Sequence, residues 1–543
     1  WIEGLKEDWC ISRQRFFGVP IPVWYVINHT KNEPEKIMPA KPEWLPIDPI
    51  TQLPPGLRHA SPEDFVGREN PFSTFDAEQA LMLVVADEDI EVSDIKIQKG
   101  DLVGINADRD VLDTWATSSI SPQINAQSIN GGERYNKLFP ADLRPQAHEI
   151  IRTWAFYTIA KAHLHANTIP WKNIIISGWC LASDKTKMSK SKGNVVTPVA
   201  LIEEKGTDAV RYWASTSRLG TDTAFSEDLL KIGRKLVNKL WNASQFASLN
   251  LDKLQGTPST ATQDVKSGII SESLDLWILS RLNQCIDKTT KAFEVFEYCD
   301  ARVAIEDFFW NDFCDNYLEL VKARAYGSPE TLSLIGRGQG EGQQQSALYT
   351  IYHCLDAILR LFAPFVPHIT EELYSYIFAD KFAKLGSIHA RGNWVVAGDY
   401  PYSEVAEKSG QAAVDVLNVI RKAKSEAGVS IKTPVAEVLV MVAGEGGSWV
   451  SLQAVLSDLK AAGNAHVIME SSSQDLPYLS ERGWYRVAVK LAKIEEKKLD
   501  GQQPQQSYKR NPDQAEYEKL DPEGVLHGAG TPDLSKHTVK LNV

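Results

Sequence analysis

The segment 184–194 contains the residues of this chain best suited to bind a polyphosphate. Four lysines and two serines lie between residues 185 and 192, shortly after an apolar run that ends at Gly178. Ammonium and hydroxyl groups donate hydrogen bonds to phosphate oxygens, and a lysine adds a mobile point charge. A solvated lysine-rich turn is the alternative for such a cluster taken alone. The order of the residues and their place in the fold must decide between the two.

Two tryptophans and an isoleucine are candidates for an apolar binding pocket. Ile150 and Trp154 are four residues apart in a helical pattern and therefore share one face. Trp115 comes from a separate segment. Taken alone, these residues fit a structural core as well as a pocket. His148, next to the same pattern, could act as a general base or position a ligand.

The region 110–225 must hold both groups of residues. Apolar strands such as 174–178 alternate there with helical patterns such as 149–165. This order predicts βα units and a parallel sheet. Upstream, residues 80–105 alternate between apolar and polar side chains, which predicts short strands. Together with the proline-rich stretch 34–75, they indicate a β-rich insertion at about residues 30–108 of a domain that covers 1–225.

Helical periodicity dominates residues 226–400. Leu274, Trp277, Ile278 and Leu282 form one apolar stripe, and a bundle of antiparallel helices accounts for this pattern. The glycine- and glutamine-rich stretch 327–347 follows no strand, so we expect a flexible loop there.

The remainder predicts a small α/β appendage over residues 401–497. Its expected elements are a helix at 405–427, a strand at 435–442, a helix at 448–462 and a strand at 465–469. Residues 485–498 carry a short helical, lysine-rich pattern. The polar stretch 498–543 is expected to form a flexible tail.

Composition excludes several classes of protein. A chain of 543 residues is too long for one core, and its net charge of −12 argues against a non-specific nucleic-acid binder. No apolar run is long enough to span a bilayer. The six cysteines are scattered without a C-x-x-C pair, which favours reduced thiols and a cytoplasmic location. The chain begins at Trp1 without an initiator methionine or secretion signal, and we expect it to be part of something longer.

Five segments in a fixed order resemble class I aminoacyl-tRNA synthetases of the valyl, isoleucyl and leucyl subgroup. The central one is the lysine loop, Lys187-Met188-Ser189-Lys190-Ser191, which resembles the second ATP-binding motif of that class. The other four are Asp8-Trp9-Cys10-Ile11-Ser12-Arg13-Gln14-Arg15, Asp113-Thr114-Trp115-Ala116-Thr117-Ser118-Ser119, the stretch Arg144 to Trp154, and Arg218-Leu219-Gly220-Thr221-Asp222-Thr223-Ala224-Phe225. The resemblance covers roughly residues 1–430, and the run Phe308 to Glu319 resembles the anticodon-binding domain.

This resemblance implies a fold and a set of sites. The fold is a multidomain α/β protein with a partial Rossmann-like catalytic domain, an all-α anticodon-binding bundle and the appendage. Lys190 would stabilise the triphosphate as the adenylate forms, and Lys187 and the serines would shape the loop. The implied ATP-binding residues are Gly178, Trp179, Lys187, Met188, Ser189, Lys190, Ser191 and His148, of which Lys187 and Lys190 are the catalytic candidates.

The implied amino acid is valine. In valyl enzymes, residues matching Trp115, Ile150 and Trp154 wall the pocket for the side chain. The run Trp115-Ala116-Thr117-Ser118-Ser119 differs from the Trp-Phe-Asp-Ser-Gly expected of isoleucyl enzymes. The resemblance implies ATP with Mg²⁺ as a substrate complex, tRNA-Val as a partner and a monomer of the complete enzyme. Lys231, Lys235 and Lys239 share a helical face and are candidates for contacting the tRNA backbone, although a solvated face explains them equally well.

The chain also departs from the family. No His-x-Gly-His-like motif occurs in it, and most of the editing insertion is absent. We therefore expect that the chain alone does not form valyl-adenylate, and that a split gene could supply a separate N-terminal polypeptide. Residues 26–110 contain no cysteine, so we expect no zinc. An isoleucyl or leucyl fragment and a non-catalytic tRNA-binding remnant are the alternatives.

Overall fold

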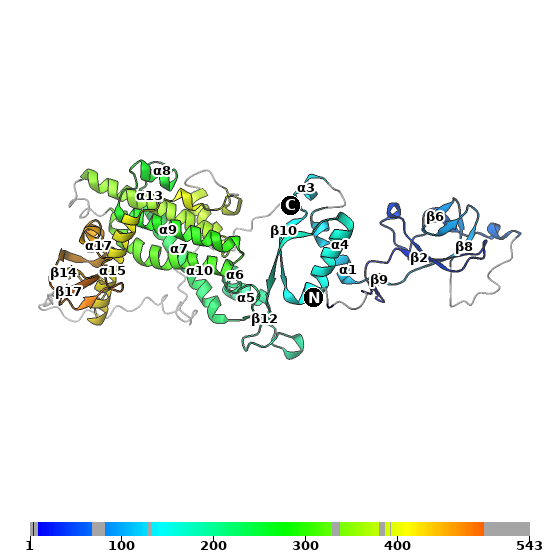
Figure 1. Ribbon diagram of the computed structural model, residues 1–543, viewed down its shortest axis with the longest axis horizontal. Coiled ribbons are helices and arrows are strands. Elements are labelled where there is room, and N and C mark those ends of the chain that lie inside the picture. The colour runs from blue at the N-terminus through cyan, green and yellow to red at the C-terminus, as the bar shows by residue number, and fades with distance from the viewer. Residues whose placement is uncertain are drawn as a thin grey trace, which may run out of the picture.

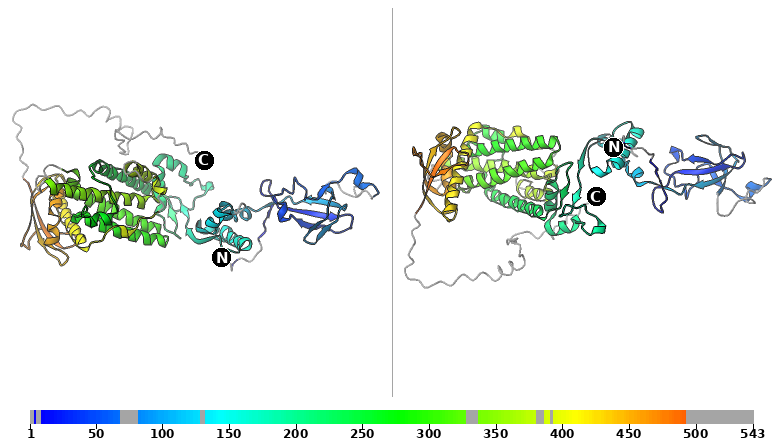
Figure 2. Two further views of the ribbon diagram at one scale, coloured as in Figure 1. Left: turned by 90° about the horizontal axis from the view of Figure 1, so that it is seen from above. Right: turned by 60° about the horizontal axis from the view of Figure 1, so that its bottom comes forward.

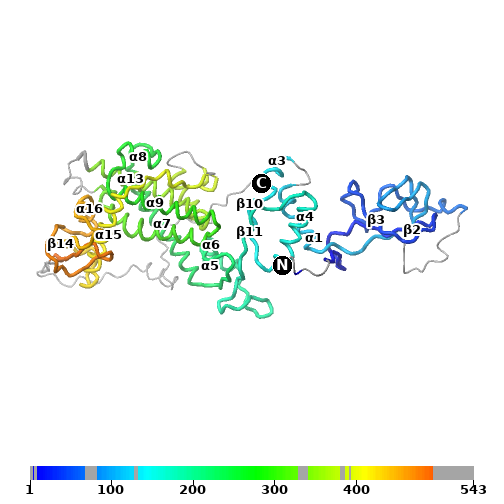
Figure 3. Tube along the Cα trace, viewed as in Figure 1, coloured from blue at the N-terminus to red at the C-terminus, as the bar shows by residue number. Residues whose placement is uncertain are grey.

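The computed structural model describes Gly4 and residues 9–67, 82–127, 132–327, 337–379, 386–390 and 393–492. Figures 1 and 2 show a β module at one end, a small α/β part in the middle, and a helical bundle with the appendage at the other end. The tube in Figure 3 follows the same order along the chain. The tail expected at 498–543 lies outside the described residues.

The β-rich insertion is a five-stranded antiparallel sheet of order β3-β2-β8-β5-β4. Alternate side chains of its central strands, among them Trp24 and Val103, point into a separate hydrophobic core. The strands are β2 Val23–Asn28, β3 Lys36–Pro39, β4 Leu57–His59, β5 Met82–Ala86 and β8 Leu102–Ala107, with a hairpin of β6 Ile90–Val92 and β7 Ile95–Ile97.

A narrow neck joins this module to the α/β part. The short strands β1 (Ser12–Arg13) and β9 (Val111–Leu112) pair antiparallel, so the chain enters and leaves the module side by side. The short helix α1 (Thr114–Ser118) follows directly and carries Trp115 toward the centre of the molecule.

The α/β part is built on parallel strands, as the sequence predicts. Strand β10 (Ala141–Ala147) pairs with β11 (Trp171–Ser177), and the connection contains a π-helical segment (Ile151–Ala155) and helix α4 (Phe156–Ala166). The chain continues into β12 (Cys180–Leu181), which pairs in parallel with β13 (Thr223–Ala224). Helices α5 (Pro198–Lys205) and α6 (Thr207–Ser215) connect these two strands.

The helical domain is a bundle with an extensive apolar core, and the predicted stripe of Leu274, Trp277, Ile278 and Leu282 is buried in it. The loop expected over 327–347 is wrong for the part that the structure describes, because helix α13 begins at Arg337. The helices are α7 Glu227–Leu251, α8 Ala261–Lys266, α9 Ser273–Glu294, α10 Tyr298–Asp307, the π-helical Phe308–Tyr317, α11 Leu318–Tyr326, α13 Arg337–Phe362 and α14 Pro367–Tyr374.

The appendage is a four-stranded sheet of order β15-β14-β17-β16, on which helices α15 and α17 pack. The helical pattern expected from residue 485 is wrong at its start, because those residues form β17 and pair with β14. The helix expected over 448–462 is broken in two. The elements are α15 Glu404–Glu426, β14 Val435–Val442, α16 Trp449–Gln453, α17 Leu456–Gly463, β15 Ala465–Glu470, β16 Tyr478–Leu479 and β17 Tyr485–Leu491.

Bundle and appendage share one hydrophobic core that runs from Tyr212 in α6 to Val487 in β17. The β module has a core of its own. Within the described residues, no helix is both long and apolar enough to cross a membrane.

Candidate active site

The lysine loop begins as a tight hairpin. Leu181 bridges to Lys187, and the Ala182 N–H donates to the carbonyl of Thr186 at 2.9 Å. At the turn, the carboxylate of Asp184 accepts from the backbone N–H of Thr186 at 3.0 Å and from its hydroxyl at 2.7 Å. These hydrogen bonds hold the pKa of Asp184 below its ordinary value, so the turn contains an anion that keeps the hairpin closed.

The second half of the loop is held by Asn194. Its side-chain oxygen accepts from the backbone N–H of Ser189 at 2.9 Å, and its amide donates to the carbonyl of Lys187 at 3.3 Å. The Ser189 hydroxyl caps the short 3₁₀ turn Lys190–Lys192 by accepting from the backbone N–H of Lys192. The loop therefore fixes its own backbone, while the side chains of Lys187 and Lys190 are exposed.

Trp179 links the loop to the end of the parallel strands. The ammonium of Lys187 lies 3.5 Å from the centre of the Trp179 ring. On the same indole, the ring of His148 packs edge-on at 4.9 Å between centroids. His148 is itself held by a 3.2 Å hydrogen bond between Nδ1 and the carbonyl of Ser177. The structure thus brings together three of the residues expected at the ATP site.

Gly178 is required where the chain passes the turn before β13. A Cβ at this position would lie 2.2 Å from the carbonyl oxygen of Thr221, so no other residue fits without moving backbone. The close approach lets the Asp222 carboxylate accept from the Trp179 backbone N–H at 2.8 Å. Thr223 donates its N–H to the carbonyl of Trp179, also at 2.8 Å. Sequence reasoning quoted Asp222 within a motif but missed this contact.

The three residues expected to wall the amino-acid pocket pack in one cluster. Trp154 is buried in it, and Trp115 and Ile150 lie half-buried at its edge. Trp154 stacks on Trp171 at 5.5 Å, and the guanidinium of Arg144 lies 3.8 Å from the centre of the Trp154 ring. Trp154 therefore belongs to the core, and Trp115 and Ile150 offer the accessible surface.

Asp113 fastens the first motif to the start of helix α1. Its buried carboxylate accepts from the indole N–H of Trp9 at 3.2 Å and pairs with the guanidinium of Arg13 at 3.2 Å. Trp9 in turn stacks on Tyr157 of α4. Asp113 opens one of the five motifs, but nothing in the sequence signals this contact.

The three lysines expected to contact tRNA lie along α7, but they are not equivalent. Lys231 pairs with Asp228 at 3.3 Å. Lys239 pairs with Asp315 at 3.1 Å, and its ammonium is 5.3 Å from the centre of the Trp310 ring. Lys235 is exposed, and we find no carboxylate in ion-pair distance of it in the described part of the chain. Only Lys235 presents a charge that is not already balanced by a neighbour.

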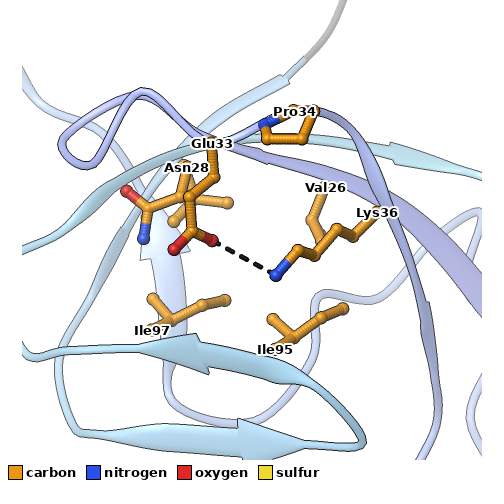
Figure 4. Close-up of a pocket in the computed structure, with 8 residues that line it drawn as sticks. Val26, Asn28, Glu33, Pro34, Lys36, Ile95 and Ile97 are labelled. Atoms are coloured by element: carbon orange, nitrogen blue, oxygen red, sulfur yellow. Dashed lines mark ion pairs between the residues drawn. The ribbon is translucent and has the colours of Figure 1, made fainter.

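A small pocket lies in the β module, remote in the fold from the lysine loop. Figure 4 shows Glu33 and Lys36, whose charged groups are 3.6 Å apart, above the aliphatic side chains of Ile95 and Ile97. Among the described residues, no group of three or more His, Cys, Asp or Glu side chains is placed to hold a metal ion.

Two family models match this chain. The model for class I tRNA synthetases (I, L, M and V) matches residues 1–41 and 72–226, which hold the loop, His148 and the pocket residues. The model for the anticodon-binding domain of tRNA ligases matches residues 275–440. Residues 1–41 and 72–226 therefore belong to the class I tRNA synthetase family. Residues 42–67, which lie outside both matches, belong to the β module.

Curated relatives are consistent with this membership. A valine–tRNA ligase of Wolbachia sp. subsp. Brugia malayi is 42% identical over 90% of this chain and 50% of its own length. Those of Wolbachia pipientis wMel and Rickettsia felis are 45% and 44% identical over 81% and 80% of this chain, and over 43% and 44% of their own. The chain spans about half the length of the curated relatives it matches.

Proposed function

We propose that this chain supplies the ATP loop, the amino-acid pocket and the anticodon-binding bundle of a valine–tRNA ligase. The reaction joins valine to tRNA-Val through valyl-adenylate and releases AMP and pyrophosphate. The observation that carries the proposal is the preformed lysine loop beside Trp179 and His148, in a chain whose relatives are valine–tRNA ligases.

The loop would act on ATP by position and charge. The carboxylate of valine is the nucleophile. Because it is already ionised at neutral pH, no general base is needed. Catalysis then consists of aligning the reactants and stabilising charge on the phosphoryl group. Lys190, exposed on the 3₁₀ turn, would reach the triphosphate, and His148 and Trp179 would position the nucleotide. Mg²⁺ would arrive with ATP as part of the substrate complex.

The pocket would select a small branched side chain. Trp115 and Ile150 offer a partly exposed apolar surface, and Trp154 supports it from the core. Such a surface would reject isosteric threonine only about 100-fold, so the complete enzyme would depend on an editing site. We place the valine side chain against Trp115 and Ile150.

The bundle would bind tRNA, with Lys235 on α7 facing the phosphate backbone. The complete enzyme would act as a monomer in the cytoplasm, where translation takes place. A part carrying the first ATP motif would complete the site, either in the same polypeptide or in a separate one. A non-catalytic tRNA-binding protein is the second candidate, because no His-x-Gly-His-like motif occurs in the 543 residues.

Filter binding with unmodified tRNA transcripts, alongside valylation, tests the proposal. We expect tighter binding of tRNA-Val than of the same transcript with an isoleucine anticodon, by about tenfold or 1.4 kcal/mol. The Lys235→Gln variant should bind more weakly and with a reduced dependence on salt, whereas Lys172→Gln, on the distant strand β11, should not. Equal binding of both transcripts would count against valine specificity in the bundle. Binding without valylation, even when the first ATP motif is supplied by a relative's N-terminal half, would favour the second candidate.

A further inference from the structure

We propose that Asp222 is a positioning residue: it fixes Trp179 as a platform that holds Lys187 until a polyphosphate takes the lysine away. The inference deepens the proposed function and rests on it, because it assigns the loop to ATP. It also assigns different roles to Lys187 and Lys190. Lys187 is held before the nucleotide arrives, whereas Lys190 is exposed on its own turn.

The backbone of Trp179 is fixed on both sides. Its N–H donates to the Asp222 carboxylate at 2.8 Å, and its carbonyl accepts from the N–H of Thr223 at 2.8 Å. Directly before it, Gly178 packs so closely on Thr221 that a Cβ at this position would lie 2.2 Å from the Thr221 carbonyl oxygen. The indole therefore has a defined place at the end of β11, set by a segment more than forty residues away in the sequence.

The lysine loop and His148 both contact the indole of Trp179. Lys187 reaches it from the hairpin that Asp184 and Asn194 hold closed, with 3.5 Å between its ammonium and the ring centre. His148 reaches it edge-on from the end of β10. A movement of Trp179 would therefore change the contacts of both Lys187 and His148.

The relative strengths of the cation–π contact and of hydrogen bonds to phosphate determine whether Lys187 contacts Trp179 or a polyphosphate. A cation–π contact at a partly exposed indole is weaker than charge-assisted hydrogen bonds from an ammonium to phosphate oxygens. Lys187 therefore rests on Trp179 in the absence of ligand and leaves it when a triphosphate or pyrophosphate is bound. Held over the ring, the lysine has fewer positions to explore, which lowers the entropic cost of the later contact.

Lysine NMR on the chain as it stands tests the platform. Reductive methylation with ¹³C-formaldehyde labels each lysine, and methyl groups above an indole face resonate upfield. We expect a strongly upfield-shifted signal from Lys187, at 3.5 Å from a ring centre, and weaker shifts from Lys41, Lys239 and Lys253, at 5.3 to 5.6 Å. The strongly shifted signal should disappear in Lys187→Arg and move to the common position in Trp179→Leu. Lys190→Gln is the matched control from the same loop and should leave the signal unchanged.

Variants of Asp222 test the positioning role. Asp222→Asn keeps an oxygen that accepts from the Trp179 N–H and should retain the upfield signal, whereas Asp222→Ala should lose it. Asp222→Glu keeps the charge but displaces the carboxylate, so it should weaken the shift even where the alanine variant does not fold. Absence of an upfield Lys187 signal in the unchanged chain, or an undiminished one in both Asp222→Ala and Asp222→Glu, would overturn the proposal.

Addition of MgATP or inorganic pyrophosphate separates this inference from the proposed function. We expect the Lys187 signal to move from its upfield position to the common one as the ligand is added. If the signal and its response to the Asp222 variants are present but no loop lysine responds to either ligand, the assignment of the loop to ATP fails and the platform remains. If ligand moves the Lys190 signal alone, the transfer from Trp179 is wrong.

Discussion

Trp154 and Trp115 lie in the same aromatic cluster but in different surroundings. Trp154 is 7% exposed, stacks between Trp171 and Arg144, and donates its indole N–H to the carbonyl of Ser118 at 3.1 Å. Trp115 is half-buried at the edge of the cluster. In the proposed pocket, Trp154 therefore belongs to the core and Trp115 offers the accessible surface.

Alanine substitutions separate these roles. We expect Trp154→Ala to lower the free energy of unfolding by about 3–5 kcal/mol, because it leaves a cavity between two packed groups. Trp115→Ala should cost less, about 1–2 kcal/mol, because less apolar area leaves the interior. Denaturant unfolding measures both. An enzyme assay of the complete protein should show the larger rise in KM for valine in Trp115→Ala, and equal stability losses would contradict the assignment.

The sequence allowed the lysine loop, Trp179 and His148 to be predicted as neighbours because short motifs carry their residue types in a fixed order. It did not reveal Asp222 or Asp113. Each of these acts through one contact with a residue tens of positions away, Trp179 or Trp9, and such a contact leaves no periodicity or spacing to detect. Residues that hold other residues of a site in place can therefore be identified only from the structure.

At the scale of elements, the strands and helices with clear periodicity were predicted, and the errors lie where composition and packing disagree. Glycines 338, 340 and 342 favour a loop, yet α13 begins at Arg337 because its continuation, from Ala347 on, is buried in the bundle. In β17, Tyr485 and Val487 are buried at a spacing of two, and pairing with β14 selects a strand over the lysine-rich helical pattern.

Arg324 joins three of these elements. Its guanidinium is 4% exposed, bonds to Asp275 of α9 at 2.9 Å and to Asp458 of α17 at 2.8 Å, and donates to the carbonyl of Gln343. Burial raises the pKa of Asp458, and that of nearby Glu272, while the guanidinium lowers both. The bundle and the appendage are therefore connected through one buried cation as well as through apolar contacts.

Arg324→Met should destabilise the chain by about 3–5 kcal/mol, since it leaves the buried carboxylates of Asp275 and Asp458 without their cation. Lys322→Ala on the same helix, which removes a surface pair with Glu319, should change stability by no more than about 1 kcal/mol. Denaturant unfolding at pH 7 compares the two variants. Similar effects of both would show that the buried network does not hold the appendage.

The defect of Arg324→Met should also grow with pH. Without the guanidinium, the pKa of Asp458 and of Glu272 rises further, because burial and the neighbouring carboxylates then act without an opposing cation. A carboxyl whose pKa is raised in the folded state contributes stability that is present below its unfolded pKa and is lost as pH rises through the folded pKa. Unfolding followed from pH 4 to pH 8 should show a deficit that is smallest at the acid end, and a deficit independent of pH would contradict this explanation.

At the scale of the whole molecule, the two largest of the four buried hydrophobic clusters in the described residues belong to different parts of the chain. The bundle and the appendage share one core, and the β module has a separate core around Trp24, Met38 and Val103. The module meets the rest of the chain at the β1–β9 neck. The alternation of residues 80–105 and the proline-rich stretch 34–75 predicted this module as an insertion, but they did not predict the paired strands of its neck.

The β module should keep its stability when metals are removed. Residues 26–110 contain no cysteine, and the apolar core accounts for the fold of the described part. A fragment containing residues 20–111 should unfold at the same temperature before and after dialysis against a chelator, as followed by circular dichroism. A fall in the unfolding temperature that zinc restores would show that a metal site stabilises the module.

The central claim is that the lysine loop of this chain handles ATP for the activation of valine. Valine-dependent exchange of pyrophosphate into ATP tests this role of the loop. The protein to assay is a chimera in which this chain replaces the matching half of the valine–tRNA ligase of Wolbachia sp. subsp. Brugia malayi. We predict exchange with valine, a loss of about 100-fold or more in Lys190→Gln, and an unchanged rate in Lys185→Gln at the hairpin tip. An undiminished rate in Lys190→Gln, or equal exchange with isoleucine, would contradict the account.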